Sequence, residues 1–296
     1  MRMLWMSAGL IGLSQSVWCA FAQPAPPPIP AAQLVREVIY NELNDHRDHG
    51  FWRYWIQSHA GNEIQLQNQV ETAEGPVTRL ALSNGLPPSA ETQQREQVRL
   101  QHLLSSPQEQ ARRRQEYAED EAHIGRIMAL MPEAYRFQYE GDENGCHKLS
   151  FNPNPAYSAH TIEARVMHAI SGTLWIDARM KRLVRIDGHV QENLDFGYGI
   201  LGRLYKGGWF QLERTQVSST EWKTDHLEVH FLGRALLLKN LNRETSEVRG
   251  GFAPVPPGLH IAQGLALLQQ SETQARTQAP VDPALAQAPA VLALRP

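Results

Sequence analysis

Three short strings in this chain match motifs with which protein kinases bind ATP and transfer phosphate. Gly197–Gly202 fits G-x-G-x-x-G, Asp195–Gly197 reads DFG, and His46–Asp48 reads HRD. Kinase chemistry needs these motifs in the order glycine loop, catalytic loop, DFG. Here the HRD string comes first, and one glycine belongs to both of the other motifs. The sequence therefore excludes a protein kinase.

The same glycines do not form a dinucleotide-binding turn. Such a turn is followed by a helix whose N-terminus holds the pyrophosphate. Residues 203–208 (RLYKGG) contain two consecutive glycines and lead into an aromatic segment instead. We interpret Gly197–Gly202 as a loop or bulged hairpin between two strands.

Histidines at two places have a spacing that suggests metal ligands. Residues 45–49 (DHRDH) end at Gly50, so they are typical of a helix C-terminus, where the dipole favours cations. His226 and His230 share one face of a predicted strand, but four strand residues span about 13 Å. A metal takes its ligands at about 2 Å. The sequence predicts no metal site and no cofactor.

Residues suited to nucleophilic or acid–base catalysis are also missing. No serine or cysteine lies in a G-x-S-x-G elbow. The acidic runs Asp142–Glu143 and Glu119–Glu121 fall in a predicted turn and on a polar helix, where nothing would shift their pKa values. We therefore predict no catalytic residues and a protein that is not an enzyme.

Apolar residues at every second position are the stronger signal. They place the apolar members of several strands on one face of a sheet. We expect that face to be concave and covered by helices, with Trp175, His226, Glu228 and His230 on the outside. If the helices cover it incompletely, it lines a cavity for an apolar ligand. The candidate ligand-binding residues are Ile64, Leu66, Leu174, Ile176, Val184, Ile186, Leu227, Val229 and Phe231.

The elements that position these residues begin with a helix over residues 31–44, where apolar side chains recur at helical spacing. A helical insertion is predicted at 89–131, with Ser89 as N-cap and a restart at Pro107, and a short helix at 161–170. We interpret the run Arg112–Arg114 as a solvated helix face, paired with acidic residues one turn away. Strands are predicted at 51–59, 63–70, 77–82, 135–140, 146–151, 172–177, 183–190, 208–217, 226–231 and 234–241.

Strands with one wet face are typical of antiparallel sheets, because parallel sheets are buried on both faces. Short turns between the predicted strands indicate hairpins. The sequence thus predicts an α+β fold, in which a large antiparallel sheet curves into an incomplete β-barrel and helices cover its concave face.

The N-terminus has the composition of a secretory signal peptide. One positive charge precedes the uncharged apolar stretch Leu4–Val17, and Ala20–Ala22 is a small-x-small cleavage signal. We expect cleavage after Ala22 and a periplasmic or secreted protein. A lipid anchor on Cys19 would need a small residue before it, and Trp18 stands there. Cys146 is then the single cysteine, so no internal disulfide forms.

Two further segments lie outside the predicted domain, which covers residues 31–252. Residues 23–30 form a proline-rich spacer. Residues 253–296 are rich in Pro, Ala and Gln and are predicted to be a largely disordered tail, within which residues 261–274 have helical spacing. We expect the tail from Pro254 onward to be dispensable for folding.

Charge and hydropathy exclude two classes of partner. The formal net charge is −3, from 28 Lys and Arg and 31 Asp and Glu, so the basic footprint of a nucleic-acid-binding protein is missing. Beyond the signal peptide, no apolar run reaches the length of a membrane span. We therefore expect no nucleic-acid partner and no transmembrane span.

The order of these elements resembles the LolA/LolB-like superfamily of periplasmic lipoprotein carriers, and more closely a group of uncharacterised exported bacterial proteins with that fold. The resemblance covers about residues 32–250 and rests on Asn84–Pro87 before a charged helix, Gly172–Asp177, Asp195–Gly197 and Phe210–Thr215. It implies an incomplete barrel whose concave face holds acyl chains beneath a lid of helices. The helical insertion is longer than the carriers have, and no arginine aligns with their lid contacts.

Two functions from different classes follow. The first is a non-enzymatic periplasmic binding or carrier protein for a lipid, an acylated lipoprotein or another apolar ligand. The second is an envelope scaffold whose half-barrel is filled by its own side chains and whose polar helix and tail bind a protein partner. An enzyme ranks third, because catalytic sites occur on any fold.

Overall fold

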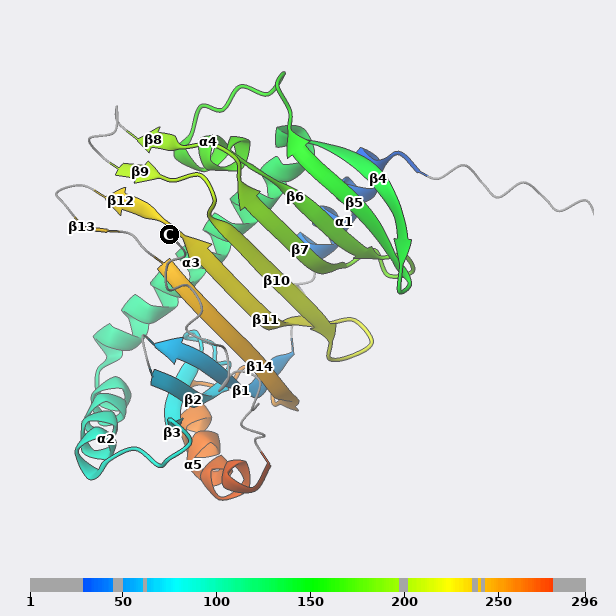
Figure 1. Ribbon diagram of the computed structural model, residues 1–296. Helices are drawn as coiled ribbons and strands as arrows, with labels where there is room; N and C mark the ends of the chain where they lie inside the picture. Colours follow the sequence, from blue (N-terminus) through cyan, green and yellow to red (C-terminus); the bar gives the residue numbers. More distant parts are fainter. Residues whose placement is uncertain are drawn as a thin grey trace, which may run out of the picture.

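The main feature of the fold is a ten-stranded antiparallel sheet, which we describe in a computed structural model for residues 29–44, 50–60, 63–196, 202–235, 239–240 and 243–278 (Figure 1). Its order, β3-β2-β1-β14-β11-β10-β7-β6-β5-β4, does not close into a barrel. The predicted α+β fold with a curved antiparallel sheet is confirmed. The strands are β1 (Phe51–Ala60), β2 (Glu63–Val70), β3 (Val77–Ser83), β4 (Tyr135–Glu143), β5 (Cys146–Pro153), β6 (Ile170–Asp177), β7 (Leu183–Val190), β10 (Trp209–Gln216), β11 (Trp222–Phe231) and β14 (Arg243–Val255).

A second, four-stranded sheet has the order β13-β12-β9-β8. In it, Arg234 pairs with Asn240 and Ala235 with Lys239. The single strand predicted at 234–241 is therefore wrong, because the chain turns back there and pairs with itself. This sheet contains β8 (Leu194–Phe196), β9 (Gly202–Leu204), β12 (Gly233–Ala235) and β13 (Lys239–Asn240).

Helix α1 (Ala31–Asn44) covers the β4–β7 half of the sheet. Its apolar stripe, which includes Leu34 and Val38, packs on strand residues such as Leu149 and Leu174 in one buried cluster, here called the α1 cluster. The remaining buried members are Val35, Ile39, Ala134, Tyr135, Phe151, Met167, Ile170, Ile176 and Val190. The ring of Phe151 packs over Gly172, and only glycine leaves space for it there. A Cβ added at Gly172 would lie 2.8 Å from the ring. Helix α4 (Ile162–His168) contributes Met167 to the same cluster.

The C-terminal end of α1 is anchored by a buried carboxylate. Glu42 accepts hydrogen bonds from both Nε and Nη2 of Arg182, at 3.1 and 3.0 Å, and its Oε2 lies 2.6 Å from Nη1 of Arg214. The backbone N–H of Leu183 donates to the same side chain. Buried charges are tolerated only when they are paired in this way, so these contacts determine where α1 lies relative to β7 and β10.

Strand β14 lies at the centre of the sheet, between β1 and β11, and was not predicted. Its sequence contains Gly250 and Gly251, and glycine is typical of turns. The structure shows why glycine is there. An added Cβ at Gly250 would lie 2.6 Å from the Trp55 ring, and Gly251 has φ +67° beside the register shift between Arg53 and Trp55.

Helix α5 (Ile261–Gln278) covers the other half of the sheet together with α2 (Ala90–Ser105). Leu265 and Leu268 of α5 pack on Val70 and Val77 in a second buried cluster, here called the α5 cluster. Its other buried members are Leu100, Leu103, Val255, Leu259 and Ile261. The packed part of the chain thus extends past residue 252 to at least Leu268, and this differs from the expectation of a tail without a core. The tail residues 279–296 and the predicted signal peptide lie outside the described residues.

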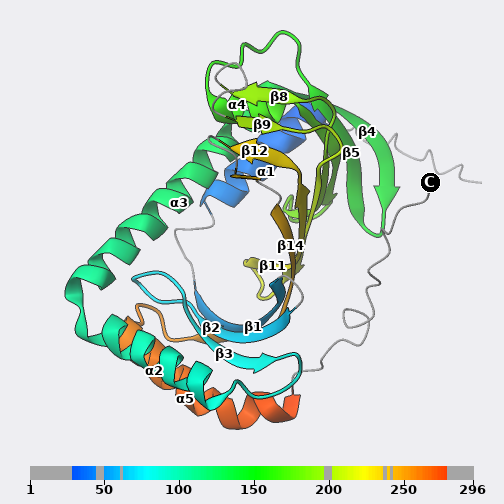
Figure 2. The same ribbon diagram turned by 60° about the vertical axis from the view of Figure 1, so that its left-hand side comes forward.

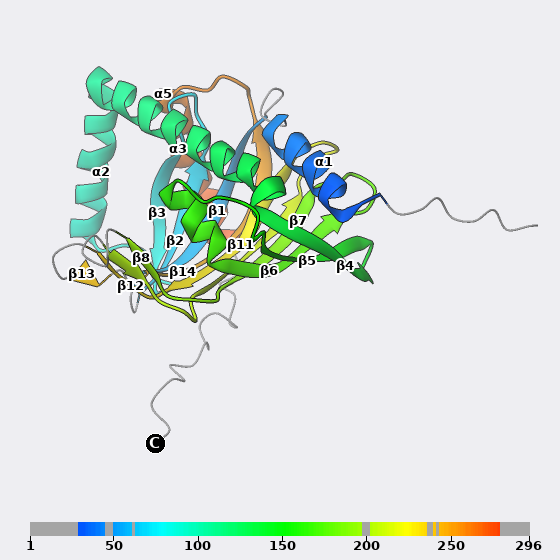
Figure 3. The same cartoon turned by 90° about the horizontal axis from the view of Figure 1, so that it is seen from above.

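Helix α3 (Pro107–Ala134) connects the two halves across the concave side of the sheet (Figures 2 and 3). Arg113 Nη2 donates to the carbonyl of Pro76 at 2.7 Å, and Arg114 Nη2 lies 2.9 Å from Glu74 Oε1. The interpretation of the arginine run as a solvated face holds for Arg112, which pairs within the helix with Glu109 and Glu116. It does not hold for Arg113 and Arg114, which bond to the segment before β3. The apolar C-terminal end of α3 packs against the α1 cluster.

The two clusters lie on opposite faces of the sheet. Directly paired residues of antiparallel strands share a face. One unbroken row of such pairs crosses most of the sheet, from Leu149 through Leu174, Ile186, Leu212, Leu227, Glu247 and Ser58 to Gln65. Leu66 and Val70 therefore face away from Leu174. Accordingly, α1 lies inside the curve and α5 outside it (Figure 2), so that helices do not cover the concave face alone.

Candidate functional site

The nine predicted ligand-binding residues do not form one site. Leu174 and Ile176 are only 2% and 0% exposed, in close contact with α1 side chains. Ile186 and Phe231 are partly buried and pack against the same α1 cluster. These residues face the side expected for them, but α1 occupies the space in front of Leu174 and Ile176. That part of the predicted cavity is a packed core.

Leu227 and Val229 lie in a different setting, in the middle of the sheet. They share the concave face with Leu174, because Leu227 pairs with Leu212 and Val229 pairs with Phe210. Both side chains are partly exposed and belong to neither buried cluster. We call Leu212, Leu227 and Val229 the central patch. No residue of β10 is buried, and neither is any residue of β11.

Val184 does not follow the expected alternation. The register of β6 and β7 shifts so that Trp175 pairs with Arg185 and Ile176 pairs with Leu183, which leaves Val184 as the extra residue of a bulge. Leu183, not Val184, packs against the α1 cluster. A bulge of one residue changes which side chains share a face, and the alternation of the sequence does not show where it occurs.

Ile64 and Leu66 face the convex side, and this contradicts their placement with Leu174. Gln65, Gln67 and Gln69 occupy the concave face at this end of the sheet instead. The alternation of β2 was predicted correctly, but the apolar members point away from the concave face. Leu66 is buried there, beneath α2 and α5, and it lines a groove.

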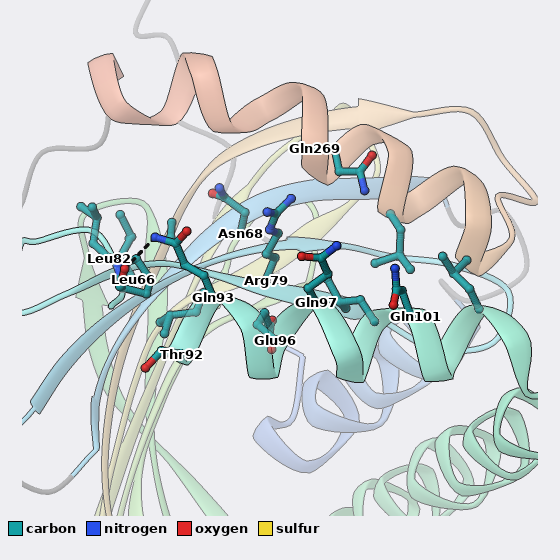
Figure 4. A pocket seen from close by; sticks show the side chains of 16 residues that line it. Leu66, Asn68, Arg79, Leu82, Thr92, Gln93, Glu96, Gln97, Gln101 and Gln269 are labelled. Carbon is teal, nitrogen blue, oxygen red and sulfur yellow. Dashed lines mark hydrogen bonds between the residues drawn. The ribbon is translucent and has the colours of Figure 1, made fainter. Parts of the chain in front are cut away.

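This groove lies between α2 and α5, on the convex face of β2 and β3, and has a volume of about 600 Å³ (Figure 4). Leucines and polar side chains share its lining, and the polar ones are mainly carboxamides. Gln93, Gln97 and Gln101 recur every four residues along α2, and Gln269 comes from α5. The remaining lining residues are Leu66, Asn68, Arg79, Leu80, Ala81, Leu82, Pro88, Thr92, Glu96, Leu100, Leu104 and Leu265.

The charges in the groove are balanced. Arg99 donates two hydrogen bonds to Glu96, both at 2.8 Å, and it also donates to the carbonyl of Thr78 at 2.8 Å. These bonds from Arg99, with smaller contributions from the Leu80 backbone N–H and the charge of Arg79, lower the pKa of the Glu96 carboxyl. Glu96 is therefore ionised, and its charge is paired with that of Arg99, which does not itself line the groove.

The concave face near β1 and β2 is polar. The amide of Gln69 donates to the hydroxyl of Tyr54, and Lys223 Nζ lies 2.8 and 3.0 Å from the two carboxylate oxygens of Glu71. Burial raises the pKa of the Glu71 carboxyl, although the charge of Lys223 opposes the rise. Burial is also the main cause that raises the pKa of Tyr54. These groups are satisfied by one another and form no exposed acid–base pair.

Of the histidines considered as metal ligands on sequence grounds, His226 and His230 lie among the described residues. Within the described ranges, no three His, Cys, Asp or Glu side chains form a group that could hold a metal ion. His226 lies 3.5 Å from Glu228, whereas the ring of His230 stacks on Trp209. Residues 45–49 and 197–201 lie outside the described residues. Burial and the nearby carboxylates of Asp177 and Glu143 raise the pKa of the Cys146 thiol, which makes it a poor nucleophile.

Of the residues that line the groove, the sequence analysis predicted only Leu66 as a ligand-binding residue. The repeat of Gln93, Gln97 and Gln101 is visible in the sequence, and with Leu100 and Leu104 it marks one face of α2. That signal predicts a mixed polar and apolar helix face. The segment that this face contacts was not predictable, because α5 begins more than 150 residues after α2 ends and its sequence has the composition of a tail.

Comparisons with known proteins find likenesses among solved structures. No family model matches the chain, and no curated protein matches it. Among solved structures, the chain is similar to a DUF1329 family protein from Desulfovibrio piger, with a TM-score of 0.27 and 7% identity over 79% of this chain and 99% of the other. At this score we transfer neither details of the fold nor a function. No helix in the described ranges is long and apolar enough to cross a membrane.

Proposed function

We propose that this protein is a non-enzymatic binding or carrier protein of the periplasm, and that its ligand is an apolar chain such as the acyl chain of a lipid or lipoprotein. The single observation that carries the proposal is the central patch. Leu212, Leu227 and Val229 are leucine and valine side chains on the concave face that no helix buries. A face of an antiparallel sheet that no helix covers is normally polar, so aliphatic side chains that stay partly exposed there indicate a partner.

The surroundings of the central patch suit an amphipathic ligand. On one side it continues into Phe210 and Phe231, whose rings lie 6.3 Å apart. On the other side, the row of paired residues that contains Leu212 and Leu227 becomes polar, first at Glu247 and then at Gln65. Glu247 is neutralised by Arg249 at 2.6 Å. An acyl chain would cover the apolar part of this row, and a polar head group would lie toward Glu247.

The export of the protein is part of the same proposal. It rests on the sequence Met1–Ala22, whose charge, apolar stretch and cleavage signal are those of a signal peptide. A periplasmic carrier must shield acyl chains from water between two membranes, which gives a partly covered apolar surface a physical use. The resemblance to the LolA/LolB-like carriers points in the same direction.

Binding of a fluorescent fatty acid to the full-length protein tests the proposal. We expect saturable binding by the parent protein and weaker binding by Val229→Asn, because the amide places a polar group in the central patch. Val248→Asn is the matched control. Val248 is also partly exposed, on the neighbouring strand, but its pairing with His226 places it on the convex face. Equal binding by both variants, or no saturable binding by the parent, contradicts the carrier function.

The envelope scaffold remains the second candidate, because one observation favours it. Leu174, Ile176 and their neighbours are buried by α1, so the β4–β7 half of the sheet is filled by the protein itself. A scaffold needs no cavity, and its partner would bind the exterior. Absence of fatty-acid binding, together with an unchanged fold in Val229→Asn, would favour this second function.

A further inference from the structure

The groove between α2 and α5 is separate from the central patch, since it lies on the opposite face of the sheet. Figure 4 shows Gln97 and Gln101 rising from α2 and Gln269 reaching toward them from α5. Asn68 adds a carboxamide from β2, beside the leucines of the floor. Carboxamides therefore border the groove on both long sides.

These carboxamides have unused hydrogen-bonding capacity. Gln93 donates to the carbonyl of Pro88 at 2.7 Å. In the part of the chain that the structure describes, the side chains of Gln97, Gln101 and Gln269 make no hydrogen bond. Each can donate and accept at once. A ligand in the groove must therefore offer both acceptors and donors. A ligand that does not would displace water from the amides and leave them without hydrogen bonds, which lowers its binding free energy.

We propose that this groove binds an extended, uncharged peptide segment of a partner protein. Backbone N–H and C=O groups supply the acceptors and donors that the glutamines need. Aliphatic side chains of the peptide would lie on the floor of Leu66, Leu82 and Leu265. From Gln93 to Gln101 the helix rises by about 12 Å, which is the length of about four residues in extended conformation.

Other ligand chemistries fit less well. An acyl chain would leave Gln97, Gln101 and Gln269 without partners. An anionic ligand would meet one carboxylate, Glu96, beside one guanidinium, Arg79, so the lining offers it no net positive charge. A sugar would satisfy the amides, but the lining residues include no aromatic ring on which a pyranose face stacks. A peptide satisfies the amides and also covers the leucines.

Fluorescence anisotropy with the full-length protein tests the proposal. The probe is a pool of fluorescein-labelled, C-terminally amidated octapeptides with Leu or Val alternating with Ser or Thr. We expect saturable binding by the parent, and binding weaker by about fivefold to tenfold in Gln97→Leu and in Gln101→Leu, because each loses one hydrogen bond. Gln94→Leu is the matched control, since Gln94 is exposed on α2 but does not line the groove.

The outcomes separate this site from the carrier function. Gln94, Gln97 and Gln101 are all exposed, so circular dichroism should show an unchanged fold in every variant. Fatty-acid binding should be the same in Gln97→Leu as in the parent. The proposal is overturned by an absence of saturable peptide binding, by equal affinities of Gln97→Leu and Gln94→Leu, or by displacement of the peptides by maltotetraose. A fatty-acid affinity that rises in Gln97→Leu would assign the groove to acyl chains and overturn it too.

Discussion

The two ends of the sheet are buried on opposite faces. At the β4–β7 end, α1 covers the concave face and Trp175 lies on the outside, between the side chains of Lys148 and Arg185. At the β1–β3 end, α5 and α2 cover the convex face, and glutamines of β2 line the concave one. The comparison shows that the buried side changes across a single continuous sheet.

The middle strands are where this change takes place. Along one row of paired residues the concave face is apolar at Leu212 of β10 and Leu227 of β11 and becomes polar at Glu247 of β14. Neither cluster reaches β10 or β11 far enough to bury any of their residues. In this sheet, whose ends are covered from opposite sides, neither covering buries the middle strands, and the central patch lies there.

The largest effect on stability should come from the α1 cluster. Phe151→Ala empties a site where the side chain is 1% exposed, and we expect it to lower the free energy of unfolding by about 3–5 kcal/mol. Urea denaturation followed by tryptophan fluorescence measures the change. Phe231→Ala, at a partly exposed ring on the same face, should cost less than half as much. Equal losses of unfolding free energy in the two variants would show that the α1 cluster is packed as tightly at Phe231 as at Phe151.

The α5 cluster should respond to a core substitution as well. Leu265→Ala removes a side chain that is 3% exposed, with an expected loss of about 2–4 kcal/mol in the same measurement. Leu104→Ala, at an exposed leucine of α2, serves as the control and should cost about 1 kcal/mol or less. If Leu265→Ala left stability unchanged, α5 would contribute nothing to the fold and the tail would be dispensable as the sequence predicted.

Glu74 holds the N-terminus of α5 and should make that attachment depend on pH. Burial opposes its charge, but hydrogen bonds from His260, Arg114 and the Ile261 backbone N–H outweigh burial and lower its pKa. A carboxyl whose pKa is lower in the folded state stabilises the fold above its unfolded pKa. The contribution is lost as the pH falls through the folded value.

Glu74→Gln should therefore cost about 1.5–3 kcal/mol at pH 7, where a hydrogen-bonded charge is lost. Its unfolding free energy should also fall less steeply than that of the parent below about pH 5. Urea titrations at several pH values provide both numbers. The control is Glu116→Gln, at an acid on the solvent side of α3. A parent and a Glu74→Gln variant with parallel pH profiles would argue against this role.

The smallest effect should come from the central patch. Leu227→Ala trims a side chain that no cluster encloses, and we expect a loss of about 1 kcal/mol or less, against about 2–5 kcal/mol for Leu174→Ala. The two leucines share a face and differ only in what covers them. A loss at Leu227 as large as that at Leu174 would mean that the middle of the sheet is also a packed core.

Local patterns in the sequence predicted most of the helices and strands, because helical and strand spacing depend on neighbouring residues. The spacing of Leu34–Leu43 predicted α1, and the N-cap at Ser89 is present, with its hydroxyl accepting from the N–H of Thr92. The alternation in β2, β6 and β11 was also read correctly. These features determined the fold class, which needs only the types of element and their hairpin connections.

Tertiary structure alone decided which face each strand buries. Alternation tells which side chains point the same way, but it does not tell which way, so Leu66 and Leu174 looked equivalent. The direction depends on pairings between distant segments, such as Glu247 with Ser58. It also depends on β14, which was not predicted because Gly250 and Gly251 are atypical of a strand. The groove depends likewise on α5 returning to β2, a contact that carries no local signal in the sequence.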